Sequence, residues 1–332
     1  MRLISSAKRV WISGLCIGGF SPTADINCRG SPRINKGYSE EGPRNSATEV
    51  SYVKGITGKG WLRDATRSRL MAEEGAMTGP HANPLIRKLE HLFPLRAEEE
   101  ELLDRSASRT VEFAADKDIV REGDKPSDCN LLLEGFVCRY KITEEGKRQI
   151  FSFHIPGDIF DAQSFLLDTM DHSVATLTPC KVALIPHTTM SDITERYPRI
   201  TRAIWKDTLV DAAIFREWMA SIGRRSAYQR IAHLMCEMVV KLHTVGLADD
   251  HHRIEWPMTQ NEVGDALGLS LVHVNRTLQE LRGEKLLTLN NGVLTVLDWE
   301  ALKRAGQFEP QYLHLRTDRP QDKGNGAARP TV

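Results

Sequence analysis

The chain has 332 residues, of which 41% are hydrophobic and 27% charged, and this balance excludes a fibrous or wholly disordered protein. Its 44 Lys and Arg residues match its 44 Asp and Glu residues, so a nucleic-acid partner would have to be held by a local basic patch. Its six cysteines form no Cys-x-x-Cys pair, which excludes a disulfide scaffold and a close-spaced metal cluster. No segment supplies the roughly 20 consecutive apolar residues that span a bilayer, so we expect a cytoplasmic protein with no membrane partner.

Residues 1–79 carry no sustained helical or strand period and are rich in Gly, Ser, Arg and Pro. Residues 10–20 follow basic residues as in a secretory signal, but Gly18 and Gly19 interrupt the apolar stretch. Met71 and Met77 stand just before the first predicted helix, which leaves a misassigned start codon as a second interpretation. We therefore predict that residues 1–79 are a disordered extension, or a stretch upstream of the true start.

The next region changes from helical to β character. Apolar residues recur at helical spacing over residues 85–92, and a second short helix is expected over residues 97–105. Between residues 110 and 187, short runs alternate with turn signals such as Glu134-Gly135 and Pro156-Gly157-Asp158. The runs are residues 119–120, 130–133, 136–142, 149–154, 174–177 and 181–185. This pattern predicts an all-β sandwich, roll or barrel.

A helical period resumes at Tyr197 and continues through two helices, a long one over residues 198–224 and a second over residues 231–242. A single β module cannot cover so much apolar helix surface. We therefore expect the long helix to pair with its twin in a dimer, with packing inside one subunit as the alternative. The residues that we assign to the dimer helix are Ile204, Asp211, Phe215, Trp218 and Ile222.

Residues 258–302 contain the pattern of a winged helix-turn-helix. Thr259 and Glu262 form a capping box at the start of one helix, and Gly268-Leu269-Ser270 is a three-residue turn into a second helix over residues 271–282. The outward face of that second helix carries Leu271, Val272, His273, Asn275, Arg276 and Gln279. Asn291-Gly292 lies between two short apolar runs, which predicts a β-hairpin wing.

The spaced glycines of the β region, the long helix and the segment TQNEVGDALGLSLVHVNRTLQEL, in this order, resemble the Crp/Fnr family of bacterial transcription regulators over residues 83–305. The resemblance implies an α+β fold with an N-terminal double-stranded β-roll (jelly-roll-like) sensor domain, a long dimerisation helix and a C-terminal winged helix-turn-helix. The implied domains are residues 1–79 (extension), 80–197 (cyclic-nucleotide-binding-like β-roll), 198–224 (dimerisation helix), 225–305 (DNA-binding domain) and 306–332 (C-terminal tail).

The resemblance also implies roles for residues of the helix-turn-helix. The expected base contacts are Leu271, Val272, His273, Asn275 and Arg276, and the expected phosphate contacts are Thr259, Gln260, Ser270 and Thr277. Arg276 matches the family arginine that reads guanine through O6 and N7. Family members commonly carry Glu, which accepts from cytosine, where this chain has Val272. We therefore expect apolar contact with thymine methyl groups at this position, and the family's site sequence does not carry over.

The sensor region departs further from the family. Where cyclic-nucleotide binders have Gly-Glu and Arg-Ser pairs, this chain has Asp161-Ala162 and His172-Ser173, and these four residues are the candidate effector pocket. An aspartate would repel a cyclic phosphate, and His is a weaker anion clamp than Arg, so we expect no tight cyclic AMP binding. Cys16 and Cys28 are too isolated to hold an iron–sulfur cluster, and we expect no cofactor.

Other side chains admit competing interpretations. Cys129, Cys138 and Cys180 are expected as buried small hydrophobes, with a redox sensor as the alternative. His251-His252 is expected to be solvated, and His154 and His172 are expected to pack in the β-roll, with metal or haem ligation as the alternative.

We conclude from the sequence that the chain is a transcription regulator and not an enzyme. It is expected to bind a palindromic DNA operator as a homodimer, under control of a signal at the β-roll, and RNA polymerase is left open as a further partner. The alternatives are a ligand-binding β-roll protein without DNA affinity and a metal-dependent β-roll enzyme. The enzyme would need a His-x-His pair with a carboxylate, and no such pair is present.

Overall fold

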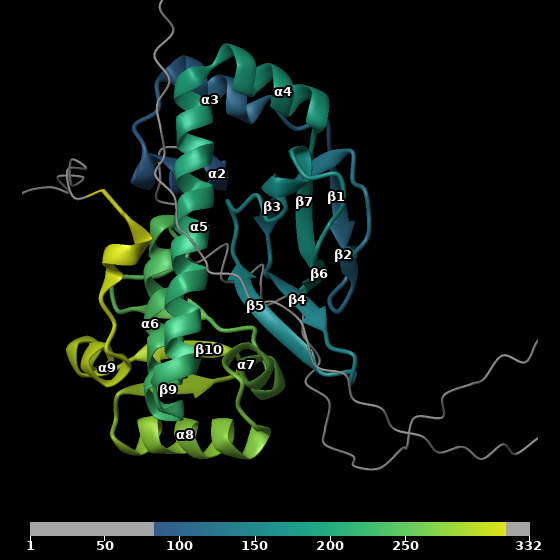
Figure 1. Ribbon diagram of the computed structural model, residues 1–332. Helices are drawn as coiled ribbons and strands as arrows, with labels where there is room; N and C mark the ends of the chain where they lie inside the picture. The colour runs from purple at the N-terminus through teal and green to yellow at the C-terminus, as the bar shows by residue number, and fades with distance from the viewer. Residues whose placement is uncertain (1–82, 317–332) are drawn as a thin grey trace, which may run out of the picture. The chain divides into compact units, whose positions relative to one another are not determined.

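The computed structural model describes residues 83–316 (Figure 1), and all of these residues belong to one compact unit of the chain. The predictions for residues 1–79, and for the tail beyond residue 316, lie outside the described part. Within it, a β-rich region is followed by a long helix and a smaller helical region with its own sheet, which confirms the predicted α+β class.

Two antiparallel sheets form the β-roll. The first has the order β1-β7-β3 and contains β1 (Arg109–Phe113), β3 (Asp128–Glu134) and β7 (Cys180–Pro186). The second has the order β2-β6-β4-β5 and contains β2 (Asp118–Val120), β4 (Val137–Ile142), β5 (Arg148–His154) and β6 (Ser173–Thr176). Apolar side chains from both sheets share one buried cluster, which includes Leu132, Val137, Val174 and Val182. A 3-10 turn, η1 (Ala162–Phe165), follows β5.

Short helices cover one end of this roll. They are α2 (Pro84–Leu92), α3 (Ala97–Asp104) and α4 (His187–Arg196). α2 begins with a proline, which needs no hydrogen-bond acceptor at the first helical position. The Asn83 side chain caps the helix by accepting a hydrogen bond from Leu85 N. Its apolar face packs with Met190 of α4 and Ile185 of β7, so this end of the first sheet is closed.

The long helix α5 (Pro198–Arg224) and the antiparallel α6 (Ala227–Thr244) lie side by side (Figure 1). The break between them comes at Ser226, whose side chain accepts from Gln229 N while the Gln229 side chain accepts from Ser226 N. α6 is buried over most of its length, and α9, α8 and α7 contact it. It is therefore the central helix of the C-terminal region.

The C-terminal region contains α7 (Gln260–Leu267), α8 (Leu271–Gly283) and α9 (Trp299–Gly306), with a sheet in the order β8-β10-β9. Its strands are β8 (Arg253–Glu255), β9 (Leu287–Asn290) and β10 (Val293–Val296). Asn291 and Gly292 have φ of 52° and 74° and form the predicted tight turn. Beyond α9, the chain continues through the 3-10 turn η2 (Pro310–Leu313).

The β-roll and the C-terminal region are joined by a continuous apolar core. Ile150 and Phe153 of β5 belong to the same buried cluster as α6 and the helix-turn-helix. At the edge of this contact, Arg148 Nε lies 2.8 Å from Asp265 Oδ2, and Gln149 donates to Ala266 O at 3.2 Å. The C-terminal region is therefore held directly against the second sheet.

Candidate functional site

The helix-turn-helix is fixed by its capping residues. Thr259 Oγ1 accepts from Glu262 N at 3.2 Å, and Thr259 N donates to Glu262 Oε2 at 2.6 Å, which is the predicted capping box. Gly268 ends α7 in the left-handed region at φ 64°, and Ser270 Oγ then caps α8 through His273 N. The predicted turn and both predicted helices are confirmed.

Gly264 is a structural residue of this motif that sequence reasoning missed. A Cβ atom on Gly264 would lie 2.6 Å from the carbonyl oxygen of Leu269 in the turn. Only glycine lets α7 approach the turn this closely. The sequence signal that could have identified Gly264 is a glycine inside an otherwise well-formed helical pattern.

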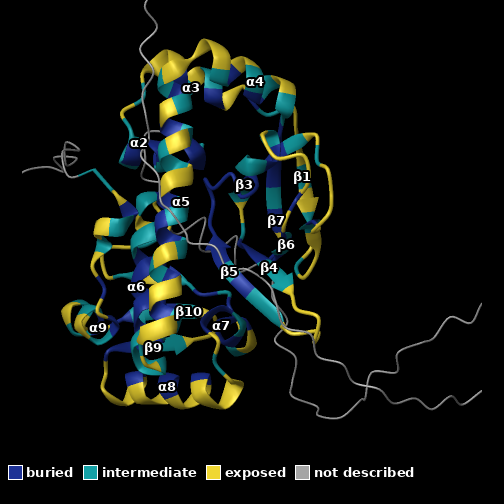
Figure 2. Cartoon of the chain, viewed as in Figure 1, coloured by how far each residue is buried: buried dark blue, intermediate teal, exposed yellow. Residues whose placement is uncertain are grey.

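The outer face of α8 is exposed, as Figure 2 shows. Leu271, Val272, His273, Asn275, Arg276 and Gln279 are all exposed, while Val274, Leu278 and Leu281 face the core. The Arg276 guanidinium makes no hydrogen bond or ion pair with any residue of 83–316. Gln279 donates to Asn275 Oδ1 at 3.0 Å, and Asn275 donates to Gln260 Oε1 at 3.2 Å, so these amides hold each other in fixed orientations.

The residues expected to contact phosphate differ in their exposure to solvent. Ser270 and Thr259 are exposed and Gln260 is half-buried, all at the helix N-termini where backbone N–H groups favour an anion. Thr277 is only 3% exposed and lies on the inner side of α8, and its phosphate contact stays a prediction. Two nearby arginines are also held internally. Arg225 lies 2.6 Å from Glu217, and Arg230 donates to Leu267 O at 2.9 Å.

The residues that we assigned to the dimer helix all lie on α5, where Trp218 is buried and the other four are half-buried. Trp218 is buried and donates to Glu237 of α6 at 3.1 Å, and Asp211 is ion-paired with Arg139 of β4. Phe215 lies beside the Arg139 guanidinium, 6.0 Å from ring centroid to Cζ. Ile204 packs on the cluster of α2 and α4, and Ile222 is half-buried. Sequence periodicity identified the helix, but it did not distinguish the two apolar faces.

A different face of α5 is open. Trp205, Leu209 and Met219 are 64%, 54% and 74% exposed. Ala212 and Arg216 lie between Leu209 and Met219 on the helix. The five residues, from Trp205 to Met219, are separated by steps of 4, 3, 4 and 3 residues. That spacing is the heptad spacing of paired helices. We call these five residues the α5 stripe.

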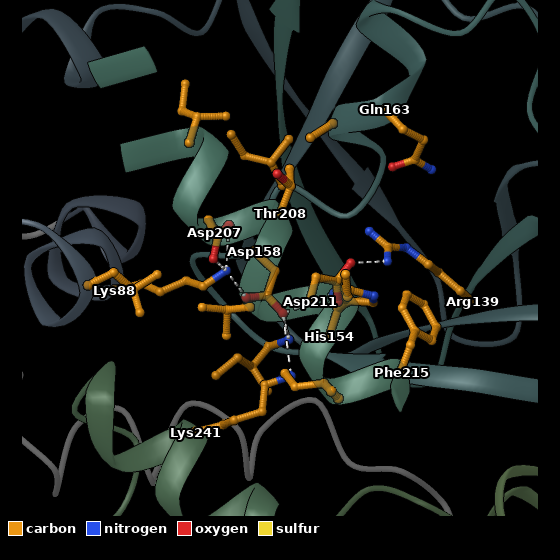
Figure 3. A pocket seen from close by; sticks show the side chains of 18 of the residues that line it. Lys88, Arg139, His154, Asp158, Gln163, Asp207, Thr208, Asp211, Phe215 and Lys241 are labelled. Atoms are coloured by element: carbon orange, nitrogen blue, oxygen red, sulfur yellow. Dashed lines mark hydrogen bonds and ion pairs between the residues drawn. The ribbon is translucent and has the colours of Figure 1, made fainter. Parts of the chain in front are cut away.

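A pocket of about 480 Å³ lies between the β-roll, α2, α5 and α6 (Figure 3). Two of the expected effector residues, Ala162 and His172, line it. Asp161 does not, because its fully buried carboxylate accepts hydrogen bonds from the backbone and the side chain of Asn130 at 2.6 and 2.5 Å. Burial raises the pKa of Asp161 to about 6. Ser173 turns away as well and accepts from Glu122 N.

An ion network, missed by sequence reasoning, crosses this pocket. Lys88 of α2 lies 2.7 Å from Asp158 and 2.6 Å from Asp207, and Lys241 of α6 lies 3.8 Å from Asp158 (Figure 3). Burial alone would raise the pKa of Asp158, but Lys88 and Lys241 outweigh it and hold that pKa well below its ordinary value. His154 Nδ1 lies 3.0 Å from the same carboxylate, so Nδ1 carries the proton. The network joins α2, the β-roll, α5 and α6.

Ser152, His154 and Asp158 are connected in the order of a hydrolase triad, with Ser152 Oγ 2.8 Å from His154 Nε2. Burial, and then the charge of Arg139, lower the pKa of His154 to about 4, so it is a poor general base at neutral pH. All three side chains are buried, and Ser152 does not line the pocket. The arrangement is a structural hydrogen-bond relay rather than a nucleophilic site.

The thiols in residues 83–316 are also buried. Burial raises the pKa values of Cys129 and Cys138 to about 12 and also raises that of Cys180, which makes all three poor thiolates. His252 packs against Trp299, with ring centroids 4.5 Å apart and ring planes tilted by 32°. Within the described ranges, no three His, Cys, Asp or Glu side chains gather as a metal site, and no helix is both long and apolar enough to cross a membrane.

Comparison with known proteins agrees with this architecture. The cyclic nucleotide-binding domain family matches residues 110–197, and the Crp-like helix-turn-helix domain family matches residues 229–305. The fumarate and nitrate reduction regulatory protein of Vibrio cholerae is 22% identical over 215 residues, which cover 64% of this chain and 85% of that protein. The nitrogen fixation regulation protein FixK of Bradyrhizobium diazoefficiens is 27% identical over 195 residues, which cover 57% and 78%. The structure of FixK2 from Bradyrhizobium japonicum superposes with a TM-score of 0.54 at 22% identity and covers 59% of this chain and 96% of that one.

The fold and the helix-turn-helix together define a DNA-binding transcription regulator with a cyclic-nucleotide-binding-like sensor domain. The chain belongs to the Crp/Fnr family. The predicted family and the predicted class of function are therefore confirmed. Regulators of this family bind DNA, typically as dimers.

Proposed function

We propose that α8 enters the major groove of an operator half-site and that Arg276 reads a guanine there. The observation that carries the proposal is the free, exposed Arg276 guanidinium at the middle of a capped, outward-facing helix. Val272, 75% exposed one turn earlier, would contact a thymine methyl group, with Leu271 beside it. Ser270 and Thr259 would bind phosphates at the two helix N-termini.

We further propose that two copies pair through the α5 stripe. Large apolar side chains at heptad spacing favour a second copy of the same helix as the partner, because each copy offers the same row of knobs. The pair would place two α8 helices about one helical turn of DNA apart, roughly 34 Å, over a palindromic site. The signal would reach α8 from the pocket through α5 and α6. We place the protein in the cytoplasm with its DNA, and contact with RNA polymerase stays a prediction.

The test is a comparison of Arg276→Ala with Arg304→Ala. Arg304 is exposed on α9, away from the proposed DNA surface. Arg276→Ala should relax preference at one base position in each half-site, by about 1 to 3 kcal/mol, in competition assays with every single-base variant of the operator. Arg304→Ala should leave the preference unchanged. Equal loss of affinity on all sequences, or an unchanged preference in Arg276→Ala, would contradict base reading by Arg276. The absence of any sequence preference in the wild-type chain would favour a ligand-binding protein without DNA specificity.

A further inference from the structure

The pocket between the β-roll, α2, α5 and α6 has more apolar than charged lining. The apolar residues come from every surrounding element and include Leu85, Leu89, Ile155, Ile214, Val240 and Leu313. A cavity of about 480 Å³ lies within the range that small-molecule sites occupy. The size and lining therefore suit a small organic molecule.

The cations of this pocket are already neutralised by the protein. Lys88 is paired with Asp158 and Asp207, and Arg139 is paired with Asp211 and also donates to Phe160 O at 2.7 Å. Lys241 donates to Phe153 O at 2.9 Å and faces Asp158. The remaining cation, Lys141, lies 2.9 Å from Glu122. The Lys141–Glu122 pair is exposed, at 42% and 50% of the two side chains. A charged ligand beside Lys88 or Arg139 would have to break a more buried pair and leave a carboxylate or a cation without its partner, which is costly.

We propose that this pocket binds an uncharged, mostly apolar small molecule with one or two hydrogen-bonding groups. The inference rests on the sensor role proposed above and names its class of ligand. Gln163 offers a polar contact, because its Oε1 makes no hydrogen bond within residues 83–316, while its Nε2 lies 3.3 Å from His172. Figure 3 shows Gln163 at the edge of the pocket, away from the ion network.

The end of the chain forms one wall of the pocket, and this links the ligand to the DNA-binding region. Residues 308–316, here called the strap, leave α9 and return across α5 to α2. Tyr312 donates to Glu237 of α6 at 2.6 Å, and Arg316 N donates to His91 O at 2.8 Å. Leu313 and Leu315 of the strap line the pocket. A bound molecule would therefore contact the sensor and the segment that continues from the DNA-binding region at once.

The first experiment uses the purified full-length chain and a pair of fluorescent probes with one aromatic framework. N-phenyl-1-naphthylamine is neutral, and 1-anilinonaphthalene-8-sulfonate carries a sulfonate. The neutral probe should bind saturably at one site per chain, the anionic probe at least about tenfold more weakly, and cyclic AMP should displace neither. Equal affinity for the two probes, displacement by cyclic AMP, or no saturable binding of the neutral probe would overturn the proposal.

Pocket-filling variants test whether the neutral probe binds in this pocket. Val240→Trp and Leu315→Trp fill it from α6 and from the strap, and each should abolish binding of the neutral probe. Ile142→Trp adds the same side chain at an exposed site outside the pocket and should change nothing. Thermal unfolding of each variant checks that it is folded, and two filling variants keep the test valid if one is not. Binding that persists in a folded filling variant would overturn the assignment.

Asp211→Asn tests the charge argument directly. It leaves Arg139 without its carboxylate, so the affinity for the anionic probe relative to the neutral probe should rise by about tenfold. No gain for the anionic probe would contradict the claim that paired charges exclude anions. Operator binding by the wild-type chain is measured separately. If it is intact while the neutral probe fails to bind, only the ligand class is refuted and the proposed function stands.

Discussion

His154 illustrates what a single buried side chain contributes to this protein. It is packed in the β-roll with Asp158, Arg139 and Asp211 around it, as the sequence led us to expect for a core histidine. Its pKa falls from an ordinary 6.5 to about 4, first because of burial and then because of Arg139. Between these two pH values, the unfolded chain binds a proton that the folded chain does not. The stability that His154 contributes is therefore fully present above pH 6.5 and is lost as the pH falls toward 4.

His154→Gln should reveal this dependence. At pH 7.5 the variant should be less stable than the wild type, and the difference in unfolding free energy should shrink by on the order of 2 kcal/mol by pH 4.5. His233, whose pKa is also lowered to about 4 by burial and by Arg225, titrates in both proteins and cancels. Urea denaturation at several pH values measures the difference. A difference that does not change with pH would contradict the neutral, buried state of His154.

Prediction of single residues from the sequence succeeded where the helical spacing of apolar residues determines which side chains are exposed. The outward face of α8 was predicted because Val274, Leu278 and Leu281 mark the inner face. Thr277 was assigned to phosphate by resemblance, although its place beside Leu278 puts it on the inner side. Asp161 was assigned to the pocket because of its place in a motif, but its hydrogen bonds to Asn130 depend on a contact 31 residues away. Such long-range contacts leave no local pattern in the sequence.

At the scale of elements, the α7–turn–α8 unit depends on the close approach at Gly264. Helix propensity alone predicts that Gly264→Ala stabilises the protein by about 1 kcal/mol. We expect destabilisation by about 1 to 3 kcal/mol instead, because the new Cβ would lie 2.6 Å from Leu269 O. Gly283→Ala is the matched control in α8, since a Cβ there meets nothing within 4 Å, and it should be neutral or slightly stabilising. Thermal unfolding decides between the two signs, and a stabilised Gly264→Ala would refute the packing argument.

The elements that the sequence predicted share strong local signals. The capping box, the Gly268 turn and Asn291-Gly292 define the helix-turn-helix and its wing, and the structure confirms them. The elements that were missed have weak signals. β1 is largely exposed along one edge of its sheet, β8 has three residues, and α4 is mostly polar. α9 and the strap were also missed, because their apolar residues are few and gain their burial from contact with α6.

At the scale of the whole molecule, dimer formation should depend on the α5 stripe rather than on the residues first assigned to it. Leu209→Asp places a carboxylate in the apolar row, so it should weaken self-association by at least about 100-fold and leave a 37.4 kDa species in sedimentation at micromolar concentration. Ile142→Asp makes the same change at a comparably exposed site in the β-roll and should leave the mass unchanged. A dimer that survives Leu209→Asp would place the interface elsewhere.

The measurement that tests the central claim most directly is selection of binding sites from random double-stranded DNA by the purified full-length chain. The account predicts enrichment of one sequence with dyad symmetry, whose half-sites lie about 10 base pairs apart from centre to centre, matching two copies of α8. Each half-site should contain a guanine whose replacement is tolerated only by Arg276→Ala. Failure of a folded dimer to enrich any sequence, with or without the neutral probe in its pocket, would contradict sequence-specific DNA binding by this chain.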